Sequence, residues 1–218
     1  MDVNKITNQI KYPLSSSSYH SQTNITSFNQ LPKFTTANKL LVKDKLCIEL
    51  SNDSNKKKKQ IIELTLGDKI CIVKPHTNLV CDTIVRGILP KRHLGLESPT
   101  VYVLVTDNKF DFYNITEIAN TKYQILDRVL ENVIVKRIFT IYQLADFLIN
   151  DLEKDIKKYQ SKLFIITGDF YLRDEQITKH DKERLYPQMI EAVEKVKDSI
   201  ILVFSPIRLA GLINYKLI

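Results

Sequence analysis

Glycine is scarce in this sequence. Only five of the 218 residues are glycine, about 2% against a usual share of about 7%. No two of the five glycines lie within seven residues of each other. A phosphate-binding loop needs glycines at fixed short offsets, because its backbone N–H groups must come close to the phosphates. The spacing therefore excludes a G-x-G-x-x-G dinucleotide fingerprint and an intact G-x-x-x-x-G-K-[ST] P-loop.

Other features are missing as well. No run of 18 apolar residues is present, so no membrane-spanning helix is expected. Residues 1–11 lack the apolar segment of a secretory signal. The three cysteines, Cys47, Cys71 and Cys81, have no metal-site spacing and are odd in number, which argues against a metal site and a disulfide framework. These absences favour the cytosol or the nucleus.

Positive charge is in excess. The chain has 32 Lys and Arg against 25 Asp and Glu, a net charge of +7, which favours an anionic partner. Four of the positive charges form one run, Lys56, Lys57, Lys58 and Lys59. Such a run is typical of a solvated loop, and it also occurs in nucleic-acid-binding and nuclear-targeting segments.

The composition divides the chain into three segments. Residues 1–33 are rich in Ser, Asn, Gln and Thr, which predicts a flexible N-terminal extension. Residues 34–60 are interpreted as a linker that ends in a polar, exposed loop over 51–60. Residues 61–218 have the regular apolar pattern of one folded domain.

Short apolar runs alternate with amphipathic stretches in this third segment. Buried strands are predicted over the five apolar runs 69–73, 101–105, 132–138, 162–167 and 199–204. Helices are predicted over 78–89, 114–123, a segment capped by Thr140, and 187–196. The alternation predicts an α/β fold with a parallel sheet covered by helices on both faces.

Ligands of parallel sheets bind at the carboxyl ends of the strands. The segments that follow the predicted strands are therefore the first places to look for a site. They begin after Val73, Val105, Ile138, Thr167 and Phe204.

Several segments follow one another in a recognisable order. Residues 67–75, Gly-Asp-Lys-Ile-Cys-Ile-Val-Lys-Pro, precede an apolar helix, and residues 101–107 with Phe110 form an apolar run followed by an acid. Leu-Glu-Asn-Val stands at 130–133, and Leu-Phe-Ile-Ile-Thr at 163–167. This order resembles the ATPase core of the RecA family over residues 67–205, from the P-loop strand to the Walker B strand and beyond. The closest types are the X-ray-repair cross-complementing paralogues and the Shu-complex subunits. The resemblance implies a RecA-like parallel sheet flanked by helices and truncated after the fifth core strand.

The chain departs from the family at the phosphate loop. After Pro75 the family continues for about seven residues to Gly-Lys-Thr, whereas here only His76, Thr77 and Asn78 precede the apolar helix. The degenerate Walker A region is thus Lys74, Pro75, His76 and Thr77. It lacks the lysine that neutralises phosphate charge.

The metal-binding positions depart as well. Thr167 replaces the Walker B aspartate, with Asp169 nearby. Asp107 stands at the position of the family's catalytic glutamate. Phosphoryl transfer depends on the lysine and on Mg²⁺ to stabilise charge. We therefore expect the ATPase motifs to be lost, with no catalytic residue, no cofactor and no metal.

Two further sets of residues are candidates for binding. Phe34 and Ala37 form a Phe-x-x-Ala tetrapeptide ahead of the core, where RecA-family recombinases carry a segment that docks to a partner. The alternative is the first strand or helix of the core. DNA contacts are predicted for the run of lysines at 56–59 and for Lys91 and Arg92, a basic cluster placed at the strand ends. The loop predicted over 173–186 has mixed charge, which is typical of a solvated surface.

The sequence therefore predicts a non-catalytic recombinase paralogue in a nuclear complex for homologous recombination. Its expected partners are another RecA-like paralogue, the recombinase and single-stranded or branched DNA. The chain is expected to form a hetero-oligomer and to make no membrane contact. The alternatives are a RecA-like scaffold of an unrelated, Elongator-type complex and a divergent ATP-binding protein. Fold-level resemblance does not separate the first alternative from the recombination subunit.

Overall fold

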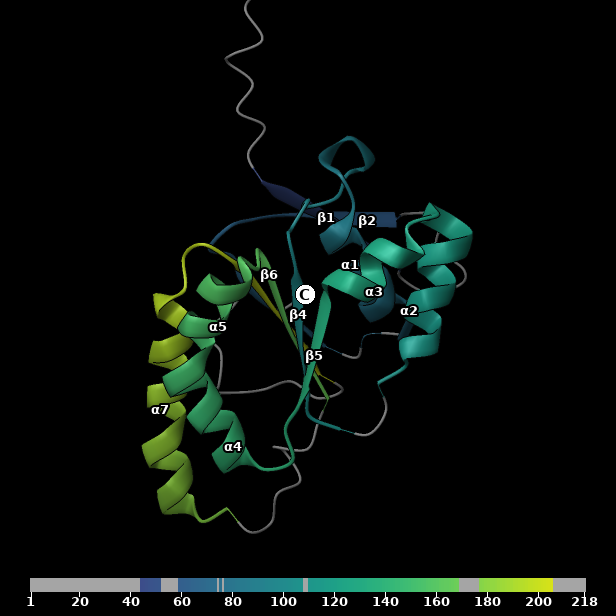
Figure 1. Cartoon of the computed structure of the whole chain (residues 1–218). Coiled ribbons are helices and arrows are strands. Elements are labelled where there is room, and N and C mark those ends of the chain that lie inside the picture. The colour runs from purple at the N-terminus through teal and green to yellow at the C-terminus, as the bar shows by residue number, and fades with distance from the viewer. Residues whose placement is uncertain are drawn as a thin grey trace, which may run out of the picture. The chain divides into compact units, whose positions relative to one another are not determined.

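A parallel sheet of five strands lies between two layers of helices (Figure 1). The computed structural model describes residues 44–51, 59–73, 75, 77–107, 110–168 and 177–205. The strands are β1 Lys45–Ser51, β2 Lys59–Thr65, β3 Lys69–Val73, β4 Val101–Val105, β5 Val133–Arg137, β6 Leu163–Thr167 and β7 Ile200–Ser205. The helices are α1 Thr77–Ile88, α2 Phe112–Ile118, α3 Leu126–Asn132, α4 Ile141–Asp146, α5 Leu152–Tyr159 and α7 Lys179–Lys195. Shorter turns of helix are η2 Lys91–His93, η3 Ala119–Tyr123 and η4 Phe147–Asp151.

The predicted α/β class is confirmed. The strand order in the sheet is β3-β7-β6-β4-β5, and every neighbouring pair is parallel. All five predicted strands are present with bounds that differ by one residue at most at either end. The helices α1, α2 and α3 cover one face of the sheet, and α4, α5 and α7 cover the other (Figure 1).

Alternate residues of each central strand enter different cores. Val101, Val103 and Val105 of β4 pack with α1, α2 and α3. Tyr102 and Leu104 of the same strand pack with α4, α5 and α7. Successive side chains of a strand point to opposite faces, so a strand that is apolar throughout needs a helix layer on each side.

An antiparallel hairpin, β1–β2, adds to the α1 layer, and the sequence did not predict it. Leu46, Ile48 and Leu64 point inward and are almost fully buried in the same core as α1. Part of the segment interpreted as a linker, 45–51 and 59–60, thus belongs to strands. The alternation of apolar and polar residues in these strands was not recognised, because only every second residue of a half-exposed strand is apolar.

A partly buried ion network holds this hairpin to the helix layer. The Arg86 guanidinium on α1 donates to Asp82 at 2.6 Å and contacts Glu49 of β1 at 3.3 Å. Lys122 and the Tyr123 hydroxyl donate to the same Asp82 carboxylate. Burial by itself raises the pKa of Asp82, but the hydrogen bonds from Lys122 and Arg86 outweigh it and leave the pKa below its usual value.

Thr140 caps a helix as predicted. The Gln143 N–H donates to the Thr140 hydroxyl oxygen at 3.2 Å, and the Gln143 side chain accepts from the Phe139 N–H at 2.9 Å. The helix then continues from α4 through the π-helical turn η4 into α5. Its inward residues Leu144, Phe147, Leu148, Leu152 and Ile156 are buried, as the amphipathic pattern indicated.

The prediction for the last helix was wrong at its start. Helix α7 begins at Lys179, with Thr178 as the cap, and Pro187 lies inside it rather than at its first turn. A proline inside a helix removes one backbone hydrogen bond. Burial of Leu185 and Met189 on either side of Pro187 offsets this loss. The loop predicted over 173–186 is therefore helical from Lys179 onward, and 173–176 lie outside the described residues.

Gly87 lets α1 approach the sheet closely. A Cβ at this position would lie 2.5 Å from Val101 Cγ2 and 2.7 Å from Leu163 Cδ2, on two fully buried strand residues. Neither distance is compatible with ordinary van der Waals contact. One of the few glycines therefore serves packing between helix and sheet.

Gly87→Ala is expected to lower the free energy of unfolding by about 1–3 kcal/mol, because the added methyl group overpacks this contact. Helix propensity alone predicts the opposite, a gain of about 1 kcal/mol. Urea denaturation followed by circular dichroism measures the difference. Lys154→Ala, on the exposed face of α5, is the control and should change little. Equal or higher stability of the Gly87 variant would contradict the close approach.

Candidate functional site

The connection between β3 and α1 is short. Strand β3 ends at Val73 and helix α1 begins at Thr77, so three residues, 74–76, join them. A complete P-loop motif spans eight residues from its first glycine to the Ser or Thr. Of the degenerate Walker A region, Pro75 and Thr77 are described, whereas Lys74 and His76 lie outside the described residues.

Hydrogen bonds connect the segments that end β4 and β6. The Thr106 N–H and hydroxyl both donate to the Thr167 carbonyl oxygen, at 2.8 and 3.0 Å. Gly168 follows with φ near +120°, a backbone conformation that glycine adopts readily. A Cβ at Gly168 would collide with the Thr106 hydroxyl oxygen. This part of the carboxyl edge is therefore filled by backbone and a threonine side chain.

No metal site is formed by the described residues. Among them, no three His, Cys, Asp or Glu side chains gather closely enough to hold an ion. Asp107 is half-buried just beyond β4, and Asp169 lies outside the described part of the chain.

Within the described residues, strand β5 forms one of the two lateral edges of the sheet. Strand β5 has a neighbour on one side only among the described strands. Exposed apolar side chains accompany it, with Val135 36%, Phe139 67% and Tyr142 44% exposed. Lys136 and Arg137 end the strand. An edge with unpaired backbone groups and apolar neighbours can accept a strand from another chain.

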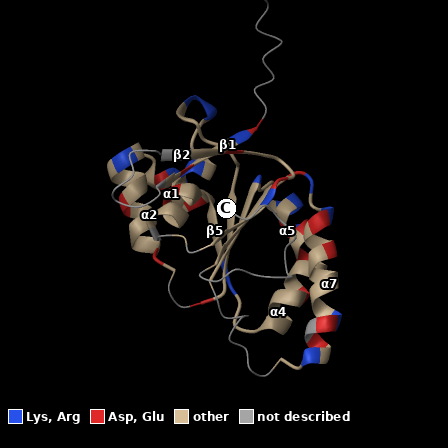
Figure 2. Ribbon diagram, turned by 180° about the vertical axis from the view of Figure 1, so that it is seen from behind, with Lys and Arg blue, Asp and Glu red and all other residues tan. Residues whose placement is uncertain are grey.

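The basic cluster after α1, predicted to lie at the strand ends, lies at the amino edge of the sheet. Helix α1 starts at the carboxyl end of β3 and returns the chain to the amino end of β4 (Figure 1). Lys91 forms an ion pair of 2.5 Å with Asp44, and Lys162, directly ahead of β6, forms one of 2.9 Å with the same carboxylate. Arg92 is exposed. Figure 2 shows Lys and Arg on this connection and beside the end of α5.

Asp44 serves two lysines at once. Partial burial raises the pKa of its carboxyl group, but hydrogen bonds from Lys91 and Lys162 outweigh that effect and lower the pKa below its usual value. The Asp44 carboxylate thus links the start of β1 to Lys91 in η2 and to Lys162 directly ahead of β6.

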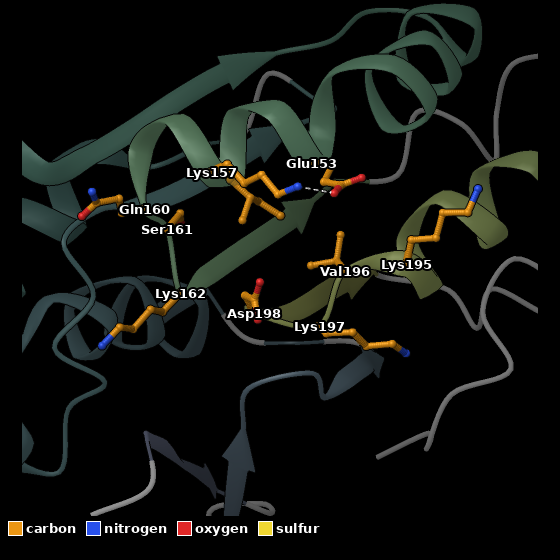
Figure 3. A pocket seen from close by; sticks show the side chains of 10 residues that line it. Glu153, Lys157, Gln160, Ser161, Lys162, Lys195, Val196, Lys197 and Asp198 are labelled. Carbon is orange, nitrogen blue, oxygen red and sulfur yellow. Dashed lines mark hydrogen bonds and ion pairs between the residues drawn. The ribbon is translucent and has the colours of Figure 1, made fainter.

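A pocket of about 440 Å³ opens at the same amino edge (Figure 3). It lies between the connection from α5 to β6 and the connection from α7 to β7. Its lining consists of four lysines, two carboxylates, two polar and two apolar residues: Lys157, Lys162, Lys195, Lys197, Glu153, Asp198, Gln160, Ser161, Ile156 and Val196.

Buried serines make the base of this pocket rigid. The Ser161 hydroxyl donates to the Leu163 carbonyl at 2.8 Å, and the Ser199 hydroxyl donates to the Ser161 carbonyl at 2.5 Å. The Lys162 N–H donates to the Ser98 hydroxyl oxygen at 2.8 Å. All three serines are at most 1% exposed, so the amino ends of β4, β6 and β7 are fixed relative to one another.

Two buried ionisable groups have structural roles. Burial raises the pKa of the Cys81 thiol to about 12, with a further rise from Asp111, so the thiol is protonated and unreactive near neutral pH. Burial likewise raises the pKa of Tyr102, whose hydroxyl donates to Asp155 at 2.9 Å. Neither group points to catalysis.

Several predicted site residues lie outside the described part of the chain, namely Phe34, Ala37, Lys56, Lys57, Lys58, Lys74, His76 and Asp169. Lys59 is the first residue of β2. Asp44, Lys162 and Lys197 were not among the residues predicted from the sequence. The sequence does show Lys162 at the start of one predicted buried strand and Lys197 close ahead of another. That these two lysines line one pocket depends on the strand order, in which β6 and β7 are neighbours.

Comparison with known proteins assigns this chain to no family, because no family model matches it and a search of curated proteins finds no significant match. Within the described residues, no helix combines the length and apolar character needed to cross a membrane.

Asp44→Asn should reduce the free energy of unfolding at pH 7 by about 1 kcal/mol, since Lys91 and Lys162 lose a shared, partly exposed partner. The pKa of Asp44 is lower in the folded chain than in the unfolded chain, so its contribution is full above pH 4 and disappears as the pH falls through the folded-state value. Urea denaturation from pH 7 to pH 3 follows the difference. Glu63→Gln, which removes an exposed pair with Lys45, is the control. A constant difference at all pH values would reject the ionic explanation.

Proposed function

We propose that this chain is a non-catalytic, RecA-like subunit of a complex for homologous recombination, where it binds DNA and a RecA-like partner and promotes assembly of the recombinase filament. The observation that carries the loss of catalysis is the three-residue connection between β3 and α1. The five-stranded parallel sheet is consistent with a RecA-like core.

The ends of β4 and β6 support the same proposal. In the RecA-family resemblance, β6 stands at the Walker B strand and Thr167 replaces its aspartate. Here the Thr167 carbonyl oxygen accepts two hydrogen bonds from Thr106, and Gly168 packs against Thr106. Phosphoryl transfer needs a cationic side chain and a metal ion at the transferred phosphate. The described residues that directly follow β4 and β6, namely Thr106, Asp107 and Gly168, include no cationic side chain. Among the described residues, no group of three or more His, Cys, Asp and Glu side chains could hold a metal ion.

The β5 edge of the sheet supports a role in assembly. A partner strand added to β5 would satisfy its outer backbone groups and cover Val135 and Phe139. The Phe34 and Ala37 segment is proposed to make the reciprocal contact on the partner. The partner is thus a second RecA-like chain, in a hetero-oligomer.

The DNA contact is proposed for the lysines at 56–59 together with Arg92. Lys91 contributes less to phosphate binding, because its ammonium group is already paired with Asp44. Exposed cations far from a fixed carboxylate gain most from contact with a phosphate backbone, since they release bound counterions. A nuclear location agrees with this role and stays part of the proposal.

Millimolar Mg·ATP is expected to leave the melting temperature of the purified chain unchanged and to yield no phosphate above the buffer blank. A ligand present at ten times its dissociation constant stabilises the folded state by about 1.4 kcal/mol, so even weak binding gives a measurable shift. Differential scanning fluorimetry and a phosphate-release assay provide the two readouts. Hydrolysis, or a shift that requires Mg²⁺, would instead favour the divergent ATP-binding alternative.

Single-stranded DNA should bind the full chain with an affinity that falls steeply with salt. Replacing the four lysines at 56–59 and Arg92 by Ala should flatten the salt dependence by about 0.7 in log–log slope for each lost phosphate contact. Fluorescence anisotropy with a labelled oligonucleotide measures both quantities. Lys179→Ala, which removes one nearly fully exposed lysine of α7, is the control for the loss of a single positive charge. No binding at low salt would leave a scaffold without DNA contact as the better description.

A further inference from the structure

We propose that the pocket at the amino edge, between the ends of α5 and α7, docks a peptide segment of a protein partner that combines one apolar anchor residue with acidic neighbours. This proposal rests on the proposed function, because it assigns a second docking site to the partner that an assembly subunit requires.

The shape of the pocket suits a protruding side chain. Its volume of about 440 Å³ falls in the range of about 300–1,000 Å³ that ligand pockets have. Ile156 and Val196 are the two apolar residues of the lining, and both belong to the core beneath α5 and α7, so they offer a small apolar area. The methylene groups of the lining lysines can extend this area. The serine hydrogen bonds at the strand ends keep the base in place. A preformed recess accepts an anchor residue at low cost in ordering.

The rim of the pocket is positive. Four lysines and two carboxylates line it, so the lining has a net charge of +2. In Figure 3 the side chain of Lys162 extends to one side, and those of Lys195 and Lys197 extend to the other. Acidic residues on either side of an anchor would meet these ammonium groups.

The pairing of the lysines leaves positive charge available. Lys157 pairs with Glu153 at 2.5 Å, and Lys195 pairs with Glu191 at 2.8 Å, each within its own helix. Lys162 shares the single carboxylate of Asp44 with Lys91.

Lys197 contributes most to this surplus. No described residue forms a hydrogen bond or an ion pair with its ammonium group. Burial lowers the pKa of the neighbouring Lys69, and the charge of Lys197 lowers it further. A carboxylate at the rim would relieve this repulsion.

A bare phosphate fits the pocket less well than an acidic peptide. Helices α5 and α7 both end here, and the carbonyl groups at a helix C-terminus favour cations over anions. The Asp198 carboxylate also stands near the centre of the pocket (Figure 3). Negative charge is therefore favoured at the rim and disfavoured at the centre. An apolar anchor with flanking carboxylates meets both conditions, whereas a compact polyanion meets only the first.

The test is a selection of displayed peptides on the full chain. A random 12-residue library is panned against the wild-type protein, and the enriched sequences are synthesised with a fluorescent label. We expect an apolar residue within two or three positions of Asp or Glu. In fluorescence anisotropy, the double variant Lys162→Glu, Lys197→Glu should bind these peptides at least tenfold more weakly. The control variant Lys154→Glu, Lys158→Glu makes the same charge change at exposed positions of α5 that do not line the pocket, and it should bind nearly as well as the wild type.

The outcomes that overturn the proposal are distinct. No enrichment, enriched peptides without acidic residues, or equal binding by the wild type and the double variant would each reject it. Displacement of the peptide by stoichiometric inorganic pyrophosphate would identify a phosphate site instead. If the double variant does not fold, Lys197→Gln alone keeps the test valid, because no described ion pair depends on it. DNA binding is measured on the same variants: its retention with loss of peptide binding supports the docking site, and its absence from the wild type counts against the proposed function alone.

Discussion

Burial of three central strands on both faces is the constraint on which this structure depends. All five residues of β4 and all six of β7 are buried, as are four of the five in β6. A strand without a polar face must be covered twice, because its side chains alternate between the two surfaces of the sheet. The two helix layers, the parallel strand order and the close approach of α1 at Gly87 all follow from that requirement.

The same arrangement makes the two ends of the sheet chemically different. Helices begin at the carboxyl edge and end at the amino edge, so the first has free backbone N–H groups and the second has free carbonyl groups. At the described part of the carboxyl edge, Thr106 and Gly168 close the space between β4 and β6. At the amino edge, lysines at the helix ends and ahead of the strands surround a pocket. This difference between the two edges is the basis for proposing peptide docking at the amino edge.

Local signals predicted the elements that depend on local physics. The Thr140 cap and the buried stripe of α1 were both recognised, because capping and amphipathic burial act within one helix. Pro187 misled the prediction of α7, since tertiary burial of Leu185 and Met189 outweighs a missing hydrogen bond. The β1–β2 hairpin was missed for a related reason: its polar outer face is visible in the sequence, but the core that it covers is not.

The sequence by itself determined the class of fold, because five apolar runs separated by amphipathic stretches are compatible with few other arrangements. It also determined the absence of a glycine-rich phosphate loop, since no side chain replaces backbone N–H groups at fixed offsets. Only the tertiary structure decided where the charges meet. Asp44 joins Lys91 to Lys162, and Lys197 lies with Lys162 around one pocket. These residues are far apart in the chain, and the strand order β3-β7-β6-β4-β5 brings them together.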